Sequence, residues 1–323
     1  MVSDIPYHKY VRLVPPETHR FVMIWWLGRM LERMLALRDQ PNFRRSWRFR
    51  APCMRLLSAL VLAIVFSASF AADGAPLPAP QQIDIPQASG ALHALLYKPG
   101  GDGPFPTVIA LHGCGGLAAH AEQILPRYRD WAEQLLSAGN AVLLPDSYGS
   151  RQLGPQCRVK EHRVLARRER VADIIAARRW LLAQPWVSRD RIALVGWANG
   201  ASAVLWAVRP QLPSKADPDF RSAIAFYPDC RLSSGLGWSA RVPTLVLIGA
   251  NDDLSSPAAC RQMIDGARGR SALARIVIYP GAYHGFDAAT GSSDAGAPEH
   301  GHIGTDPEAR ADSQKRVAEW LAR

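Results

Sequence analysis

From about Ile83 to the C-terminus, short apolar runs alternate with longer stretches in which apolar residues recur every three or four positions. The short runs are rich in β-branched residues or continuously apolar, which is typical of strands buried on both faces of a sheet. We predict seven such strands: Ala91 to Tyr97, Thr107 to Leu111, Ala141 to Leu144, Arg191 to Val195, Ser222 to Phe226, Thr244 to Ile248 and Ile276 to Tyr279.

The longer stretches have the 3.6-residue period of amphipathic helices. They are Ala121 to Ser137, His162 to Ala183, Ala201 to Val208, Ala258 to Ala267 and Pro307 to Ala322. Strands that alternate with helices predict an α/β fold with one doubly wound, mostly parallel sheet. The Pro- and Ala-rich stretch Ala75 to Pro86 is interpreted as an extended lead-in that precedes the compact domain.

A secretory signal peptide is predicted over residues 54–71. Met54 and Arg55 precede an apolar run from Leu56 to Phe70, and small residues follow at a cleavage site before Ala72. A membrane anchor is the alternative, but the run is shorter than the ~20 apolar residues that span a bilayer. We therefore expect one folded domain over residues 72–323 in the periplasm or outside the cell, with no stable membrane span after cleavage.

Residues 1–53 form a basic extension upstream of this signal. They are interpreted as the product of a start codon assigned too early, or as an amphipathic surface helix between His19 and Leu37. The extension contains ten basic and four acidic residues, so it carries +6 of the total formal charge of +10. An Arg-rich helix after Glu161 also carries acids and an apolar face, which favours a solvated surface for Arg163, Arg167, Arg168, Arg170, Arg178 and Arg179. This distribution argues against a nucleic-acid partner, which requires a basic folded domain.

Two glycine-rich turns follow predicted strands. The first, His112-Gly113-Cys114-Gly115-Gly116, allows backbone N–H groups to point at a developing oxyanion. The second, Gly196-Trp197-Ala198-Asn199-Gly200, fits the nucleophile elbow G-x-S-x-G at both glycines but has alanine at its centre. Because ligands of open α/β sheets bind beyond the carboxyl ends of the strands, both turns belong to a candidate site.

Two further strand ends supply ionisable side chains. Asp252, with Asp253 as the alternative, follows one strand as the carboxylate that would orient an imidazole. His284 lies in the run Tyr279-Pro280-Gly281-Ala282-Tyr283-His284-Gly285-Phe286-Asp287 after the next strand, as the candidate general base. The order of elbow, acid and histidine along the chain is that of α/β hydrolases.

These motifs, together with Asp146-Ser147-Tyr148-Gly149-Ser150-Arg151, resemble the dienelactone hydrolase family of the α/β hydrolases, which act on esters and lactones. The resemblance covers roughly Ile83 to Arg323. It implies His284 as the base, Asp252 as its carboxylate, and the N–H groups of Cys114 and Asn199 as the oxyanion hole. It also implies cysteine or serine at position 198. Tyr148 and Arg151 either line the pocket or lie at the surface.

Ala198 excludes covalent catalysis from that position, since a methyl group cannot attack a carbonyl. Three other routes are considered: His284 activates a water molecule, Ser202 acts from the first turn of the following helix, or Cys114 is a displaced nucleophile. We expect the Ser202 hydroxyl to bond to the backbone instead. An alternative explanation is that alanine was introduced at position 198 deliberately, in order to trap a complex.

After signal cleavage the chain keeps four cysteines, Cys114, Cys157, Cys230 and Cys260, an even number that indicates two disulfides in an oxidising compartment. Four cysteines allow three pairings, and neighbouring strand ends favour Cys114 with Cys157 and Cys230 with Cys260. No spacing typical of a zinc site occurs, and His300 with His302 is interpreted as part of an exposed loop. No phosphate-binding glycine motif supports a nucleotide, so no cofactor is expected.

The sequence therefore predicts an exported hydrolase of a small carboxylic ester or lactone, built around His284, Asp252 and an altered elbow. The competing hypothesis is a non-catalytic protein that binds a small carbonyl or carboxylate ligand in the same pocket. Ala198 favours the second hypothesis, and the retained His284 and Asp252 favour the first. The sequence does not identify the physiological substrate or the oligomeric state.

Overall fold

A computed structural model describes residues 78–88, 90–120, 123–210, 218–231, 237–267, 273–289 and 301–323. The chain divides into two units, Met1–Ala75 and Pro76–Arg323, and all of the described residues belong to the second. The upstream extension of residues 1–53 and the signal peptide of residues 54–71 lie outside the described residues. Within the described ranges, no helix has the length and apolar character needed to cross a membrane.

The centre of the second unit is one eight-stranded sheet, ordered β1-β2-β6-β3-β7-β8-β9-β10. β1 pairs antiparallel with β2, β2 pairs antiparallel with β6, and the other neighbours are parallel. The strands are β1 (Gln81–Gln87), β2 (Gly90–Tyr97), β3 (Phe105–Leu111), β6 (Ala141–Pro145), β7 (Val187–Trp197), β8 (Ser222–Phe226), β9 (Thr244–Gly249) and β10 (Ala274–Tyr279). β4 (Ala118–His120) and β5 (Gln123–Ile124) form a separate two-stranded sheet.

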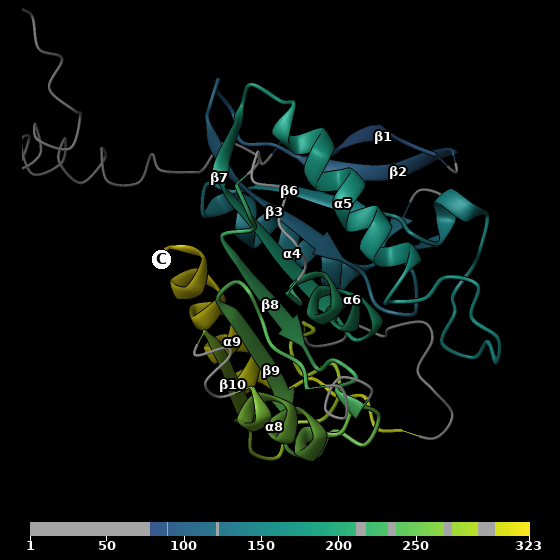
Figure 1. The fold of residues 1–323 in the computed structure, drawn as a ribbon, viewed down its shortest axis with the longest axis vertical. Helices are drawn as coiled ribbons and strands as arrows, with labels where there is room; N and C mark the ends of the chain where they lie inside the picture. The colour runs from purple at the N-terminus through teal and green to yellow at the C-terminus, as the bar shows by residue number, and fades with distance from the viewer. Residues whose placement is uncertain are drawn as a thin grey trace, which may run out of the picture. The chain divides into compact units, whose positions relative to one another are not determined.

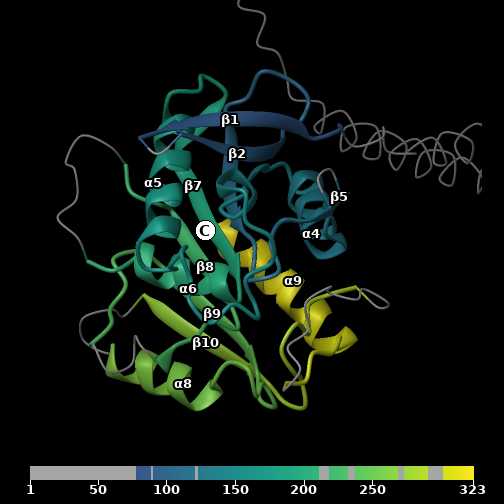
Figure 2. The same cartoon turned by 90° about the vertical axis from the view of Figure 1, so that its right-hand side faces the viewer.

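Helices cover both faces of the sheet, as Figures 1 and 2 show. The helices α5 (Glu169–Leu182) and α6 (Asn199–Ala207) lie on one face, and α4 (Pro126–Ser137) and α9 (Pro307–Leu321) lie on the other. α8 (Pro257–Gly266) packs against β9 and β10, and a 3-10 turn, η2 (Gly149–Arg151), follows β6. The predicted doubly wound, mostly parallel sheet in one domain is confirmed.

The central strands are mostly apolar because both of their faces are covered. Every residue of β6, β8 and β9 is buried. β1 instead has the burial pattern of an edge strand, with most of its residues exposed. The interpretation of Ala75 to Pro86 as an unpaired lead-in is wrong for its second half, because Gln81 to Pro86 pair with β2. Edge strands bury few side chains, so the apolar pattern of β1 is weak.

Two helices begin later than their apolar period predicts. The stretch from Ala121 was expected to be helical, but α4 begins at Pro126, where a proline suits the first turn, and β4 and β5 precede it. The stretch from His162 was also expected to be helical, but α5 begins at Glu169. The Glu169 carboxylate accepts a hydrogen bond from the backbone N–H of Leu165, which fixes a turn before the helix.

Candidate active site

The elbow is a sharp turn between β7, which ends at Trp197, and α6, which begins at Asn199. Ala198 at its centre has φ 48° and ψ −113°, a conformation that non-glycine residues rarely adopt. Its backbone N–H donates to the carbonyl of Phe226 at 3.0 Å. A Cβ at Gly200 would lie 2.2 Å from the carbonyl oxygen of Leu111, so the close approach of α6 to β3 requires glycine there. The elbow keeps its strained geometry although it lacks a nucleophile.

His284 and Asp252 meet beside the elbow. The Nδ1 atom of His284 lies 2.9 Å from Oδ2 of Asp252, and both side chains are buried. The other oxygen, Oδ1, accepts from the backbone N–H groups of Leu254 and Ser255 at 3.0 and 2.7 Å. These two donors fix the direction of the carboxylate. The pair therefore directs the remaining ring nitrogen of His284, Nε2, away from Asp252.

The alternative acid, Asp253, has a different partner. Its carboxylate contacts Nδ1 of His302 at 2.8 Å, and both side chains are exposed. The His302 contact holds the pKa of the Asp253 carboxyl below its usual range. The two neighbouring acids thus have different partners: Asp252 forms a buried pair with His284, and Asp253 forms an exposed pair with His302.

The glycine-rich turn after β3 lies against the elbow. The Tyr128 hydroxyl accepts from the backbone N–H of Gly113 at 2.8 Å, and the Cys114 carbonyl accepts from the Gln156 N–H at 2.7 Å. Among the described residues, no acceptor bonds the backbone N–H of Cys114 or of Asn199. Asn199 is the first residue of α6, where N–H groups have no partner within the helix. Both N–H groups are thus available for a ligand oxygen.

His112, which precedes this turn, is a fully buried neutral imidazole. Its Nδ1 faces the Gly113 carbonyl at 2.8 Å, and its Nε2 accepts from the Ser147 N–H at 3.2 Å. These partners require the proton on Nδ1. Burial is the main cause of a pKa far below the ordinary value, and the charge of Arg170 lowers it further. His112 therefore stabilises the turn after β3 and does not face the cavity.

A cavity of about 310 Å³ joins these parts. Gly113, Cys114, Ala198, Asn199 and His284 line it, together with Leu125, Arg127, Tyr128, Cys157, Ser202, Asp229, Leu254, Ser255 and Ile303. Its volume is at the lower end of the range for sites that bind small molecules. A larger cavity of about 600 Å³ lies beyond Gly115, but neither His284 nor Ala198 lines it. We take the smaller cavity as the candidate site because the ionisable groups converge there.

The cysteines pair as the topology of the chain favours. Cys114 bonds Cys157, and Cys230 bonds Cys260. Cys114 is therefore not a thiol in this structure and supplies no nucleophile.

The Ser202 hydroxyl donates to the Ala198 carbonyl at 3.2 Å and accepts from the Asp229 N–H, so its bonds are to the backbone as expected. In the part of the chain that the structure describes, no group of three or more His, Cys, Asp or Glu side chains could hold a metal ion.

A buried arginine contacts the residue that follows Ala198 in the elbow. Arg170 has no exposed surface, and its Nη1 donates to the side-chain oxygen of Asn199 at 2.9 Å. The Tyr148 hydroxyl donates to the same oxygen at 3.2 Å. The interpretation of Arg170 as part of a solvated helix face is therefore wrong, although Arg163, Arg167, Arg168 and Arg179 are exposed. The helical spacing of apolar residues in α5 does not indicate whether the tip of a long side chain is buried or exposed.

Arg151 also turns inward. Its guanidinium forms a two-pronged pair with the buried carboxylate of Asp173, at 3.0 and 2.7 Å. Neither Arg151 nor Arg170 lines the candidate cavity. Tyr148 lies at the boundary, since its ring lines the larger cavity and its hydroxyl reaches Asn199. Burial and the charge of Asp146 raise the pKa of Tyr148, so this hydroxyl keeps its proton.

Asp287 connects the histidine loop to the elbow. Its fully buried carboxylate accepts hydrogen bonds from Trp131, Trp197 and Tyr227 at 2.8, 2.9 and 2.6 Å. The ring of Tyr227 lies 4.3 Å from that of His284. No sequence pattern predicted a role for Asp287, although it stands three residues after His284 in the same motif. An acid inside an apolar aromatic run is the signal that could have identified it.

The fold and the strand-end site define an α/β hydrolase architecture. The sequence pattern of the dienelactone hydrolase family matches residues 92–323, and the chain belongs to this family. The family consists of hydrolases, and the structural neighbours of this chain include esterases. A comparison with curated protein sequences gave no match.

Solved structures share this fold at low sequence identity. A dienelactone hydrolase from Anabaena variabilis is 21% identical with a TM-score of 0.56, over 76% of this chain and 98% of that one. A dienelactone hydrolase-like promiscuous phosphotriesterase from metagenomic libraries is 19% identical with a TM-score of 0.58, over 75% and 97%. Thermogutta terrifontis esterase 2, phosphorylated by paraoxon, is 20% identical with a TM-score of 0.55, over 76% and 94%. At these identities, the similarity shows a shared fold.

Proposed function

We propose that this protein hydrolyses a small carboxylic ester or lactone, and that a water molecule activated by His284 replaces the missing nucleophile. The observation that carries the proposal is the buried 2.9 Å pair of His284 and Asp252, which opens onto the same cavity as Ala198. A binding pocket has no need of an imidazole oriented by a carboxylate. The absence of a side chain beyond Cβ at Ala198 leaves room for water.

The proposed reaction uses each group in one role. Nδ1–H of His284 donates to Asp252, so Nε2 accepts a proton from water as the water oxygen attacks the carbonyl carbon. The N–H groups of Cys114 and Asn199 bind the oxyanion of the tetrahedral intermediate. The intermediate then expels the alcohol oxygen, which takes the proton back from Nε2. One ester and one water give one acid and one alcohol.

The expected rate is low. Loss of the nucleophile costs a factor of about 10⁶ in the subtilisin case, and oxyanion-hole and binding effects leave a residual of ~10³ to 10⁴ over water. General-base catalysis contributes ~10² to 10⁴. We therefore propose slow turnover in which the chemical step limits the rate.

A second candidate function is binding without turnover of a small carbonyl or carboxylate ligand. Ala198 is the observation that favours it, because the elbow keeps its strained backbone and its N–H donors without a nucleophile. The ligand oxygen would accept from the N–H groups of Cys114 and Asn199. His284 and Asp252 would then be structural.

Hydrolysis of p-nitrophenyl acetate by the purified protein separates the two functions. For the hydrolase, we expect slow turnover that His284→Ala abolishes and Tyr283→Ala, a change at the exposed neighbour, preserves. Turnover that is unaffected by His284→Ala would refute the water mechanism. A silent protein that gains activity in Ala198→Ser or Ala198→Cys would favour the binding function.

We also propose export, with residues 54–71 as a cleaved signal peptide and the periplasm or the cell exterior as the destination. The two disulfides support this proposal, because such bonds persist in oxidising compartments. Mass spectrometry of the protein from fractionated cells should detect a mature N-terminus at Ala72 outside the cytoplasm. Recovery of the intact N-terminus in the cytoplasm would contradict it.

A further inference from the structure

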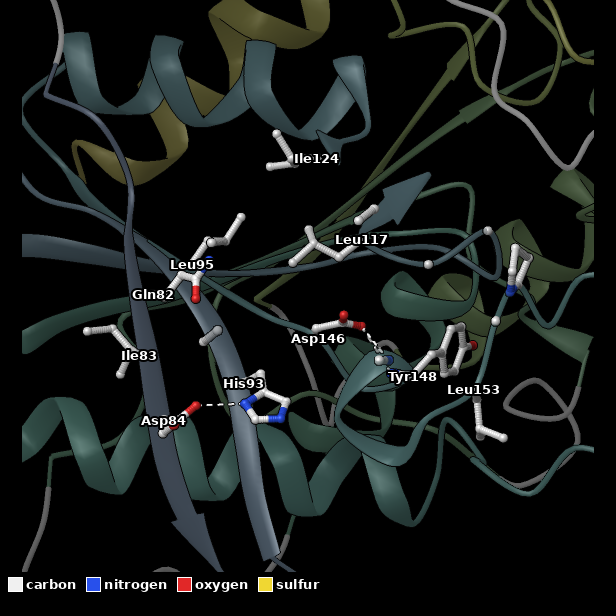
Figure 3. Close-up of a pocket in the computed structure, with 17 residues that line it drawn as sticks. Gln82, Ile83, Asp84, His93, Leu95, Leu117, Ile124, Asp146, Tyr148 and Leu153 are labelled. Atoms are coloured by element: carbon white, nitrogen blue, oxygen red, sulfur yellow. Dashed lines mark hydrogen bonds and ion pairs between the residues drawn. The ribbon is translucent and has the colours of Figure 1, made fainter. Parts of the chain in front are cut away.

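The larger cavity is a groove of about 600 Å³ between the β1–β2 hairpin, the turn after β3 and the segment after β6. Figure 3 shows its lining side chains. Leu95 of β2 and Leu117 point toward each other, Asp84 and His93 form a pair at one end, and Tyr148 and Leu153 lie at the other. Its volume is in the range of pockets that bind ligands.

The groove adjoins the candidate active site. Gly115 lines both cavities, and two chain segments run from one cavity to the other. The segment 113–118 begins in the active-site cavity and continues along the groove, and the segment 153–157 runs in the opposite sense. The Cys114–Cys157 disulfide and the hydrogen bond from Gln156 N–H to the Cys114 carbonyl join these segments. A ligand whose carbonyl accepts from the Cys114 N–H thus lies next to the groove.

The lining selects for apolar, uncharged ligands. Ile83, Leu95, Leu117, Ile124 and Leu153 contribute apolar side chains, and most of the accessible lining is apolar. Among the described residues, its ionisable side chains are Asp84, Asp146 and His93, and none of these residues is a lysine or an arginine. The Asp146 carboxylate accepts hydrogen bonds from the backbone N–H groups of Tyr148 and Gly149. Against the described lining, an anionic group would therefore meet carboxylates and no lysine or arginine to pair with.

We propose that the groove binds an uncharged apolar chain attached to the carbonyl that the active-site cavity holds. This inference rests on the site described under the proposed function and specifies its ligand class as aliphatic esters or lactones with an extended chain. The chain passes Gly115, packs between Leu95 and Leu117, and ends near the paired Asp84 and His93 side chains. The Asp84 Oδ1 and His93 Nδ1 atoms are 2.6 Å apart, and both side chains are largely exposed. The far end of the groove is therefore polar and accepts a neutral or cationic terminus.

Binding of methyl ketones tests this proposal without any turnover. Ketones offer a carbonyl to the oxyanion donors but cannot be hydrolysed, so calorimetric titration of the full chain with 2-pentanone, 2-heptanone and 2-nonanone measures binding alone. Burial of a methylene stabilises by ~0.8 kcal/mol, so we expect about a fourfold gain in affinity for each one added. We expect 8-oxononanoate, which carries a carboxylate at the far end, to bind about tenfold more weakly than 2-nonanone.

Two variants should shorten the groove. Leu95→Trp and Leu153→Trp each fill part of it, and we expect either to abolish the chain-length dependence while 2-pentanone binding is retained. Two positions are used because one substitution could impair folding, which circular dichroism would reveal. Ile175→Trp, at a half-exposed position of α5 outside both cavities, is the matched control and should leave the dependence unchanged.

Equal affinity for all three ketones, or no ketone binding at all, would overturn the groove proposal. A chain-length dependence that both tryptophan variants keep would also overturn it. Failure of the groove proposal can be distinguished from failure of the proposed function, because slow hydrolysis of p-nitrophenyl acetate does not require the groove. If ketone affinity depends on chain length but the protein has no esterase activity, the result would support the groove proposal and contradict the proposed hydrolase function.

Discussion

Ala198 occupies a backbone conformation that costs a non-glycine residue about 1–3 kcal/mol. The conformation persists because Gly196 allows β7 to pack closely on α6 and Gly200 allows α6 to pack closely on β3, and because the Ala198 N–H is bonded to the Phe226 carbonyl. In a hydrolase with an intact nucleophile, this strain would present the reactive side chain to the substrate. In this protein the strained conformation is retained although Ala198 has no reactive side chain. The strain should therefore lower the free energy of unfolding by a measurable amount.

We therefore expect Ala198→Gly to raise the free energy of unfolding by about 1 kcal/mol. Relief of strain exceeds the ~0.4–1 kcal/mol by which glycine favours the unfolded chain. Urea denaturation measures the change. Ala201→Gly is the matched control: Ala201 is buried within α6, and glycine there should destabilise by about 1 kcal/mol. Equal destabilisation by both variants would show that position 198 is unstrained.

At the scale of elements, the loop after β10 is joined to β7, β8 and α4 through one buried carboxylate. Asp287 accepts from Trp197 at the end of β7, Tyr227 after β8 and Trp131 of α4. All three partners are donors, so the carboxylate is suited to this position and an amide is not. Through Tyr227, which packs on His284, the same contacts set the orientation of the candidate base.

Asp287→Asn should lower the free energy of unfolding by about 2–3 kcal/mol. The amide offers only one oxygen to three donors and brings an N–H₂ group toward them, which leaves buried groups unsatisfied. Urea denaturation followed by tryptophan fluorescence measures the loss. Glu319→Gln, at an exposed position of α9, should change stability by less than about 0.5 kcal/mol. A loss below 1 kcal/mol for Asp287→Asn would mean that the three donors find other acceptors.

At the scale of the whole molecule, the buried neutral His112 links stability to pH. Its pKa is lowered in the folded state, so the unfolded chain binds a proton that the folded chain does not. This contribution to stability is complete above the unfolded pKa of ~6.5 and is lost as the pH falls toward the folded pKa.

Denaturation at pH 7, 6 and 5 should therefore show a steeper decline in the natural protein than in His112→Gln. The expected difference in slope is up to about 1.4 kcal/mol per pH unit below pH ~6.5. The side-chain oxygen of glutamine can accept the Ser147 N–H in place of Nε2. Parallel pH profiles would show that another group accounts for the acid sensitivity.

The two disulfides also act on the whole molecule, because each constrains the unfolded chain. They close loops with sequence separations of 43 and 30 residues, for which chain entropy predicts about 4 kcal/mol each. We expect the paired substitutions Cys114→Ser/Cys157→Ser and Cys230→Ser/Cys260→Ser to lower Tm to a similar extent. Of the two pairs, Cys114 and Cys157 line the active-site cavity, so only their replacement should also weaken binding of 2-pentanone.

The local features of this protein could be predicted from its amino-acid pattern. Continuous apolar runs and helical periods predicted seven of the eight strands of the main sheet and the helices, because burial on two faces leaves a strong pattern. The order of the elbow, Asp252 and His284 predicted which strand ends carry the candidate site. β1 was missed because a mostly exposed edge strand carries little apolar signal.

The folded structure alone establishes the contacts between segments that are far apart in the chain. It paired Asp252 with His284 and Asp253 with His302, and it turned the Arg170 side chain inward to Asn199. It also placed Asp287 among two tryptophans and a tyrosine, and the groove beside Gly115. Such choices depend on which side chains packing brings within a few ångströms of each other, and a one-dimensional pattern contains no record of those distances.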